Sequence, residues 1–184
     1  MTPSKRLFFA LWPDPAQQAT LAEAARNVVE RSGGHAVPAE NLHITLVFLG
    51  SVPEPDIDSV ERIAEKVTGE VGHEPVPIAL DVFEHWKKPR IVCLTTQQPA
   101  SAAASRIAEL LLERLTAAGF SPDVRPFRPH VTLARKVSRG GTTSMLPPLR
   151  WTFDEFALVE SQTGPAGAVY RCRRRFTVVP PTLC

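Results

Sequence analysis

Two short segments of the chain carry the same arrangement of one histidine and one threonine. One reads Leu-His-Ile-Thr-Leu and contains His43 and Thr45, and the other reads Pro-His-Val-Thr-Leu and contains His130 and Thr132. Both are rich in aliphatic and β-branched residues, which favour a β-strand. Because side chains alternate along a strand, each histidine shares one face with its threonine, and the aliphatic residues occupy the other face. The pattern therefore predicts two imidazole–hydroxyl pairs, each backed by buried aliphatic side chains.

A pair of histidines suits an in-line displacement at phosphorus. The ordinary pKa of histidine is about 6.5, so one imidazole can be neutral while the other is protonated near neutral pH. The neutral ring removes a proton from the attacking oxygen, and the protonated ring gives one to the departing oxygen. The hydroxyls of Thr45 and Thr132 can donate to the non-bridging phosphate oxygens, where charge must be held. The residues alone leave open which histidine is the acid and which is the base.

An arginine near the second pair would add a charged contact to the phosphate. The candidates are Arg135, just beyond this segment, and Arg128, just before it. We favour Arg135, because the end of a strand opens onto the rim of a cleft. Strict alternation nevertheless places Arg135 on the face opposite His130. We therefore expect the chain to bend there if Arg135 contacts the phosphate.

Other kinds of site have less support in the sequence. His43 and His130 lie 87 residues apart without a cluster of carboxylates or thiols, so we expect no metal and no other cofactor. There is no Gly-rich phosphate loop with Lys and Ser/Thr, and no serine-elbow motif. His35, His73 and His85 have no second copy, and we interpret them as structural or surface residues.

The composition fits a folded protein with one sizeable core. The chain has 184 residues, of which 43% are hydrophobic, and this size fits a single domain over residues 1–184, with two lobes. The apolar run 7–12 is far shorter than the roughly 20 residues that a spanning helix needs. The three cysteines are few, odd in number and widely spaced, which is typical of reduced thiols. We therefore expect a cytoplasmic protein without a membrane segment.

Charge is distributed unevenly along the chain. Residues 1–122 contain 11 Lys and Arg against 15 Asp and Glu, and residues 123–184 contain 10 against 4. The overall net charge is only +2. A basic end on a nearly neutral protein indicates local contact with an anionic partner.

The order of predicted elements contains a repeat. A buried strand 6–11 is followed by a helix that Asp14 caps, with Pro15 at its first position and Gln17 completing a capping box. This helix runs to about Arg31, and the first histidine strand then ends at Gly50. The further expected elements are a helix 55–67, a strand 76–83, a turn 84–89, a strand 90–95, a helix 101–118, the second histidine strand, a loop 136–148, and strands 151–160 and 169–179.

The succession of strand, helix and histidine strand thus occupies residues 6–46 and again residues 90–133. Two similar halves related by a pseudo-twofold axis would bring the histidine strands together at their seam. We therefore predict a bilobal α+β fold with two pseudo-symmetric halves, mainly antiparallel sheets, and outer helices around a central cleft.

These motifs resemble those of the two-histidine (2H) phosphoesterase superfamily. More narrowly, the chain is similar to the bacterial and archaeal RNA 2′,3′-cyclic phosphodiesterases, historically labelled 2′–5′ RNA ligases. The matching segments are Arg6–Leu11, Asn41–Gly50 and Phe127–Arg135, and Phe156–Ser161 resembles the late strand of the family. The resemblance extends over nearly the whole chain.

The resemblance implies hydrolysis of a 2′,3′-cyclic phosphate at the end of an RNA or nucleotide, leaving a 2′-phosphate. Carried over by position, His43 is the proton donor and His130 the proton acceptor, while Thr45, Thr132 and Arg135 bind the phosphate. The partners implied are RNA ends or nucleotides with such a phosphate. No membrane or obligate protein partner is evident, and we expect a monomer.

Three alternatives stay open at this point. The same site could join RNA ends by 2′–5′ ligation, with a 5′-hydroxyl in place of water. The chain could instead be a non-catalytic nucleotide- or RNA-binding module. The third concerns segment 171–175, where alternation places Arg171, Arg173 and Arg175 on one strand face. That face either extends an RNA-binding surface or is simply solvated.

Overall fold

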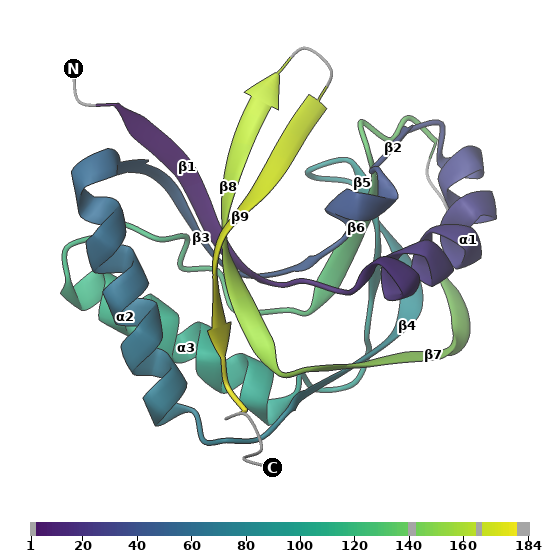
Figure 1. Ribbon diagram of the computed structural model, residues 1–184. Helices are drawn as coiled ribbons and strands as arrows, with labels where there is room; N and C mark the ends of the chain where they lie inside the picture. The colour runs from purple at the N-terminus through teal and green to yellow at the C-terminus, as the bar shows by residue number, and fades with distance from the viewer. Residues whose placement is uncertain (1–2, 140–142, 165–166, 180–184) are drawn as a thin grey trace.

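The computed structural model describes residues 3–139, 143–164 and 167–179, which form one nine-stranded sheet and three α-helices (Figure 1). The elements are β1 (Ser4–Leu11), α1 (Pro15–Ser32), β2 (His35–Ala36), β3 (Ile44–Pro53), α2 (Ile57–Glu70), β4 (Val76–Trp86), β5 (Ile91–Thr95), α3 (Ala102–Ala117), β6 (His130–Arg135), β7 (Ser144–Phe153), β8 (Glu155–Gly164) and β9 (Gly167–Thr177). Short 3₁₀ turns occupy Ala39–Asn41 and Glu54–Asp56. None of the helices in these ranges is both long and apolar enough to cross a membrane.

The sheet has the same layout on either side of its centre. The strand order is β7-β4-β5-β6-β3-β1-β8-β9, with the short β2 beside β6. All pairings among the described residues are antiparallel. From the centre outward, one half therefore consists of β3, β1 and the edge pair β8 and β9. The other half consists of β6, β5 and the edge pair β4 and β7. The predicted α+β class with two similar halves and antiparallel pairing is confirmed.

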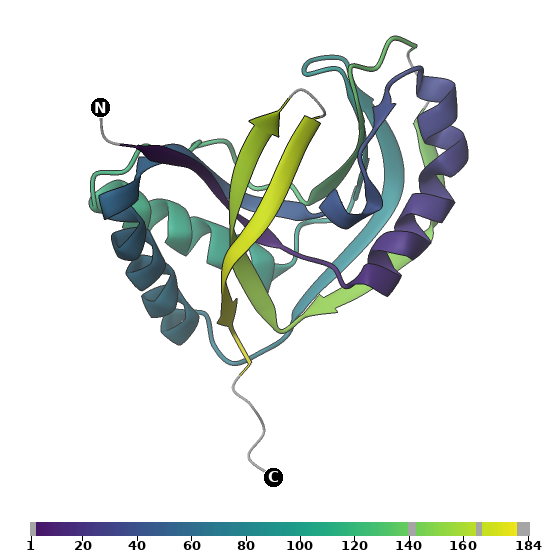
Figure 2. The same cartoon turned by 45° about the horizontal axis from the view of Figure 1, so that its top comes forward.

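The helices cover one face of this sheet. Helix α1 packs on β5 and β6, whereas α3 packs on β3 and β4, and α2 lies against α3 and β9 (Figures 1 and 2). Each repeat helix thus contacts the other half, α1 through β5 and β6, and α3 through β3 in addition to β4 of its own half. The main core lies between helices and sheet and includes Leu7, Phe9 and Leu11 from β1, all fully buried. This interlocking holds the two halves together across the seam.

The start of α1 follows the sequence prediction. The Asp14 carboxylate accepts a hydrogen bond from the Gln17 backbone N–H at 2.8 Å, and the Gln17 side chain accepts one from the Asp14 N–H at 2.9 Å. Pro15 stands at the first helical position, and Gly33 ends the helix with a φ of 59°. The predicted capping box and helix end are confirmed.

Two element ends differ from the sequence predictions. Gly50 lies inside β3 rather than at its end, with a φ of 76° where the pairing of β1 with β3 shifts register. A left-handed glycine at such a bulge lets the strand bend and continue. Residues 84–86 belong to β4 and not to a turn, because they pair with β5 through Trp86 and Ile91.

The late strands also differ. Residues 151–153 end β7, which pairs with β4, and residues 155–164 form β8, which pairs with β1, so the predicted strand 151–160 is really two. β7 already begins at Ser144, within the predicted loop. Pro147 and Pro148 argued against a strand in the sequence analysis. A proline on the open side of an edge strand such as β7 removes no hydrogen bond between strands.

The prediction that Arg171, Arg173 and Arg175 share one face is wrong. Arg175 pairs with Ala157 and Arg171 pairs with Glu160, and the register of β8 with β9 shifts between these pairs. Because paired residues share a face, and positions 157 and 160 lie on opposite faces, the two arginines do as well. Three arginines of this segment are also paired with carboxylates: Arg173 with Glu160, Arg174 with Glu61 and Glu65, and Arg175 with Glu155. These contacts favour the second alternative, a solvated and internally neutralised edge strand.

Replacing the cap of α1 tests its contribution to stability. Asp14→Ala removes the acceptor for the Gln17 N–H and should lower the free energy of unfolding by about 1 kcal/mol. Glu30→Ala, at an exposed position on the same helix, should change it by less than about 0.5 kcal/mol. Urea unfolding of both variants measures the difference, and equal effects would show that the cap does not stabilise the helix.

Candidate active site

The two histidine–threonine pairs meet where β3 and β6 join at the centre of the sheet. The described pairing of these strands is Ile44 with Val131, both fully buried on the helix side. Continuing this antiparallel register by one residue each way sets His43 opposite Thr132 and Thr45 opposite His130. Cβ atoms of directly opposed residues lie about 4.5–5.5 Å apart. The seam therefore gathers two imidazoles and two hydroxyls on the sheet face away from the main core.

Both imidazoles are held in the same way. His43 Nδ1 lies 2.7 Å from the carbonyl oxygen of Asn41, and His130 Nδ1 lies 2.8 Å from that of Arg128. A carbonyl oxygen only accepts, so Nδ1 must carry a proton and donate in each case. In the neutral ring, Nε2 then holds the lone pair. Each histidine can therefore exchange a proton through Nε2 without losing the contact that orients it.

Burial lowers the pKa of both histidines. For His43 the pKa falls to about 4, chiefly through burial and then through the charges of Arg135 and His130, while the Asn41 carbonyl opposes the shift. For His130 the causes that lower the pKa are again burial first, followed by Arg128, Arg125 and Arg135, against the Arg128 carbonyl. Both rings are thus neutral at neutral pH in the free protein.

Arg135 reaches the histidine face because β6 contains a bulge. Val92 of β5 pairs with Ala134, but the next residue of β5, Cys93, pairs with Thr132, which leaves Leu133 as the extra residue. Leu133 and Ala134 are both buried, so alternation slips by one position and exposed Arg135 returns to the face of Thr132. The charge of Arg135 acts on both histidines. The bend that the sequence analysis required is this bulge.

Aromatic side chains surround His43. The Trp12 ring stacks on the imidazole with 5.0 Å between centroids and 3° between planes. Phe8 lies 4.9 Å away on β1, and Tyr170 of β9 meets the ring edge-on at 5.2 Å. The Asn41 amide donates to the Ala168 carbonyl at 3.2 Å, tying the β8–β9 hairpin to this loop. These contacts bury the imidazole and fix its plane.

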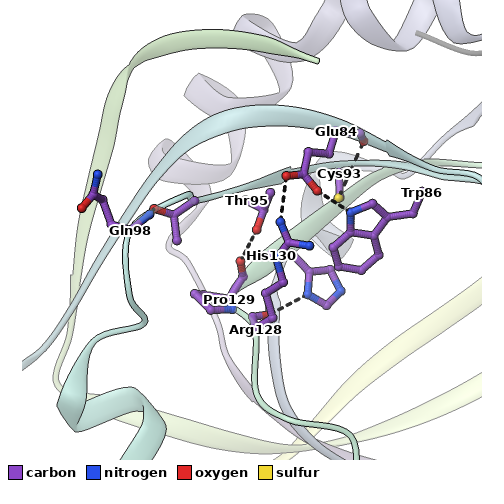
Figure 3. A network of polar contacts seen from close by, with 9 residues as sticks. Glu84, Trp86, Cys93, Thr95, Gln98, Arg128, Pro129 and His130 are labelled. Carbon is purple, nitrogen blue, oxygen red and sulfur yellow. Dashed lines mark hydrogen bonds and ion pairs between the residues drawn. The ribbon is translucent and has the colours of Figure 1, made fainter. Parts of the chain in front are cut away.

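A charged network surrounds His130 instead (Figure 3). The Glu84 carboxylate accepts one hydrogen bond from Trp86 Nε1 and another from the Arg128 guanidinium, both at 2.7 Å. That guanidinium also lies over the Trp86 ring at 5.2 Å, and the ring lies 4.7 Å from the His130 imidazole. The side chain of Arg128, the second arginine candidate, thus forms an ion pair with Glu84, and its backbone carbonyl orients the His130 ring.

The threonines of the two motifs differ from the one beside them on β5. The Thr95 hydroxyl donates to the Pro129 carbonyl at 2.9 Å and is fully buried. Thr45 and Thr132 are half-buried, and within the ranges that the structure describes neither hydroxyl makes a hydrogen bond to another residue. They are therefore available to a ligand on this face.

The sequence analysis missed the residues that pack on the histidines. Trp12 and Phe8 could have been found, because they alternate with buried Leu7, Phe9 and Leu11 and so must share the opposite face. Glu84 and Trp86 were hidden by the predicted turn. Tyr170 gave no signal, since its approach to His43 depends on pairing between β8 and β9.

Two observations bear on other ligands. No group of three or more His, Cys, Asp or Glu side chains placed to hold a metal ion occurs in the described parts of the chain. A cavity of about 230 Å³ lies under α1, on the far side of the sheet from the histidines, with an apolar lining that includes Ala25, Val29, Leu42 and Leu133. It belongs to the packing of α1 rather than to the histidine site.

Comparison with known sequences and structures identifies the family. The family model described as the 2′-5′ RNA ligase superfamily matches residues 12–165. An RNA 2′,3′-cyclic phosphodiesterase of Thermus thermophilus is 29% identical, covering 94% of this chain and 90% of the relative. Another of Escherichia coli is 30% identical, covering 96% and 95% respectively.

Solved structures agree with the sequence matches. E. coli LigT complexed with 3′-AMP superposes with a TM-score of 0.82 at 25% identity, covering 96% of this chain and 99% of that one. The Thermus thermophilus protein TT0787 gives a TM-score of 0.79 at 27% identity, covering 94% and 97%. With the two His-x-Thr pairs at the seam of a two-half antiparallel sheet, the chain belongs to the 2′-5′ RNA ligase superfamily of two-histidine phosphoesterases.

Proposed function

We propose that the protein hydrolyses the 2′,3′-cyclic phosphate of an RNA or nucleotide to a 2′-phosphate, by acid–base catalysis without a metal. The observation that carries this proposal is the meeting of His43, Thr45, His130 and Thr132 on one face of the β3–β6 seam. The names of the relatives from Thermus thermophilus and E. coli support the same activity. A substrate phosphate between two imidazoles has an attacking and a departing oxygen on opposite sides, as in-line displacement requires.

In the proposed reaction, His130 is the base and His43 the acid. Nε2 of neutral His130 takes a proton from water, and the water oxygen attacks phosphorus. The bond between phosphorus and the 3′ oxygen breaks, and protonated His43 gives its proton to that oxygen. Thr45, Thr132 and Arg135 hold the non-bridging oxygens as charge collects on them. The products are a 2′-phosphate and a free 3′-hydroxyl.

The acid role of His43 depends on the charge of the substrate. With a pKa of about 4 in the free protein, this ring carries a proton in few molecules at neutral pH. A phosphate anion beside the imidazole favours its charged form and raises its pKa. We therefore propose that His43 becomes the acid when the cyclic phosphate binds. Charged Arg128 beside His130 opposes protonation there, which suits a base.

The description of the matched family favours 2′–5′ RNA ligation as a second candidate. The same residues would then remove a proton from a 5′-hydroxyl instead of water. Incubation with cyclic-ended and 5′-hydroxyl RNA fragments separates the two activities, because ligation gives a longer product and hydrolysis gives a 2′-phosphate.

Replacement of either histidine tests the acid–base pair. His43→Ala and His130→Ala should each lower kcat for 2′,3′-cyclic AMP by about 10²–10⁴-fold, because each removes one proton transfer. His73→Ala, at an exposed loop position, should keep the kcat of the unaltered protein. Thermal unfolding checks that all three variants fold.

Near-normal turnover by either active-site variant would rule out acid–base catalysis by His43 and His130 as a pair. Binding of 2′-AMP without turnover by the unaltered protein at every pH from 4 to 9 would instead favour a non-catalytic binding module.

The pH dependence of kcat/KM follows from the lowered pKa values. The productive free protein has His43 protonated and His130 neutral, so kcat/KM should follow a bell-shaped pH curve whose two limbs reflect the two lowered pKa values, that of His43 being about 4. Because the pKa of His130 is also lowered, the fall should begin below the ordinary value of about 6.5. The descending limb of kcat should lie at higher pH, since bound phosphate raises both values. A kcat/KM still rising at pH 8 would contradict this scheme.

Removal of the Arg128 charge tests the electrostatics around His130. Arg128→Gln should raise the pKa of His130, because a positive charge that disfavours the imidazolium is lost. NMR titration of the imidazole Cε1 proton of His130 measures this shift. Arg62→Gln on α2 is the matched charge control. An unchanged or lower His130 pKa would show that Arg128 does not keep this ring neutral.

A further inference from the structure

Two exposed turns beside the histidine site are rich in positive charge. The β4–β5 turn follows Trp86, which packs on His130, and the segment after β6 follows Arg135, so both turns start beside the site. We call their six exposed cations the basic rim, which consists of Lys87, Lys88, Arg90, Arg135, Lys136 and Arg139.

The two turns are fastened together. Val137 N–H donates to the Arg90 carbonyl at 3.0 Å, and Arg90 Nε donates to the Val137 carbonyl at 3.1 Å. Ile91 pairs with Arg135 where the strands leave the turns. Both turns lie at the same end of the lobe that contains β4, β5 and β6 (Figures 1 and 2). The two turns that contain the basic rim therefore lie side by side.

The six rim cations have no ion-pair partner within the described ranges, whereas eight of the other 15 Lys and Arg residues, Lys5 and Arg26 among them, contact a carboxylate. Arg114, Arg125, Arg128, Arg173, Arg174 and Arg175 each contact a carboxylate. None of the six rim residues does so within 3–139, 143–164 and 167–179. The residues outside these ranges include no Asp or Glu. An uncompensated cluster attracts anions much more strongly than scattered, paired charges do.

The rim is also continuous with the reaction site. Arg135 belongs to both, because the β6 bulge returns its exposed side chain to the face of Thr132. The other five cations belong to the two turns and not to the strand segments that carry the histidines. A mononucleotide has no further phosphate for them, whereas an RNA strand has one for each nucleotide.

We infer that the basic rim binds the phosphodiester backbone of an RNA strand whose cyclic-phosphate end occupies the histidine site. This inference rests on the proposed function and makes a polynucleotide end the preferred substrate over a free cyclic mononucleotide. The contacts are charge-based, so they select for strand length and not for base sequence.

The test removes three rim charges that have no other structural task. The variant is Lys87→Gln, Lys88→Gln and Arg139→Gln combined. Arg90 stays because its side chain supports Val137, Lys136 stays because its φ is 54°, and Arg135 stays because it belongs to the catalytic proposal. The control variant combines Arg62→Gln, Lys66→Gln and Arg106→Gln on α2 and α3, which changes the net charge equally on the other lobe.

The two variants are compared on two substrates at low salt. One is an oligoribonucleotide of about ten residues ending in a 2′,3′-cyclic phosphate, and the other is 2′,3′-cyclic AMP. The rim variant should lose about tenfold or more in kcat/KM on the oligoribonucleotide, and its log–log salt slope should fall by about 2, at about 0.7 for each lost contact. The kcat/KM of the rim variant on 2′,3′-cyclic AMP should stay within about twofold of that of the unaltered protein. The kcat/KM of the control variant should do the same on both substrates. In each case few charged contacts between protein and substrate are lost.

Equal losses on both substrates, or no loss on the oligoribonucleotide, would overturn the inference. A parallel binding measurement separates it from the proposed function. Fluorescence anisotropy with a 2′-phosphate-ended oligoribonucleotide, compared with displacement by 2′-AMP, reports rim binding whether or not the protein turns over either substrate. If turnover is absent but only the rim variant loses affinity for the oligonucleotide, the proposed function is wrong, whereas RNA binding by the basic rim is supported.

Discussion

The pairing of β3 with β6 is the contact on which the rest of the site depends. It places Ile44 beside Val131 in the core, and the same register places each histidine opposite the threonine of the other strand. A slip of one residue would turn every one of these side chains to the other face. Helix α1 packs on β5 and β6 of the opposite half, and α3 packs on β3 of the opposite half, so both helices support this register. Helix packing on both sides of the seam therefore helps to keep two short strands aligned.

The packing that aligns the histidines also sets their chemistry. Burial makes both rings poor bases for free protons, and His43 most clearly, with its pKa of about 4. A bound anion raises the pKa of a neighbouring imidazole. In the proposed reaction, the cyclic phosphate therefore prepares His43 to act as the acid. Under this proposal, substrate binding and catalytic readiness depend on the same electrostatic condition.

Much of this arrangement could be predicted from the sequence, because local rules decide it. Alternation set each histidine with its threonine, and the Asp14–Gln17 capping box fixed the start of α1. Three features could not be predicted from local rules. They are the β6 bulge that returns Arg135 to the histidine face, the pairing that extends β4 to Trp86, and the edge position of β7 that tolerates its prolines. All three depend on which strands become neighbours.

The two halves share a backbone plan but differ in what surrounds each imidazole. His43 lies among the rings of Phe8, Trp12 and Tyr170, which bury it. His130 lies against a network of Glu84, Trp86 and Arg128, whose nearest charge opposes protonation. In the proposed reaction, the symmetric positions bring the two rings to opposite sides of one phosphate. An acid and a base must nevertheless differ, and a repeat alone cannot make them differ. Under this proposal, the surroundings, and not the repeated motif, separate the two roles.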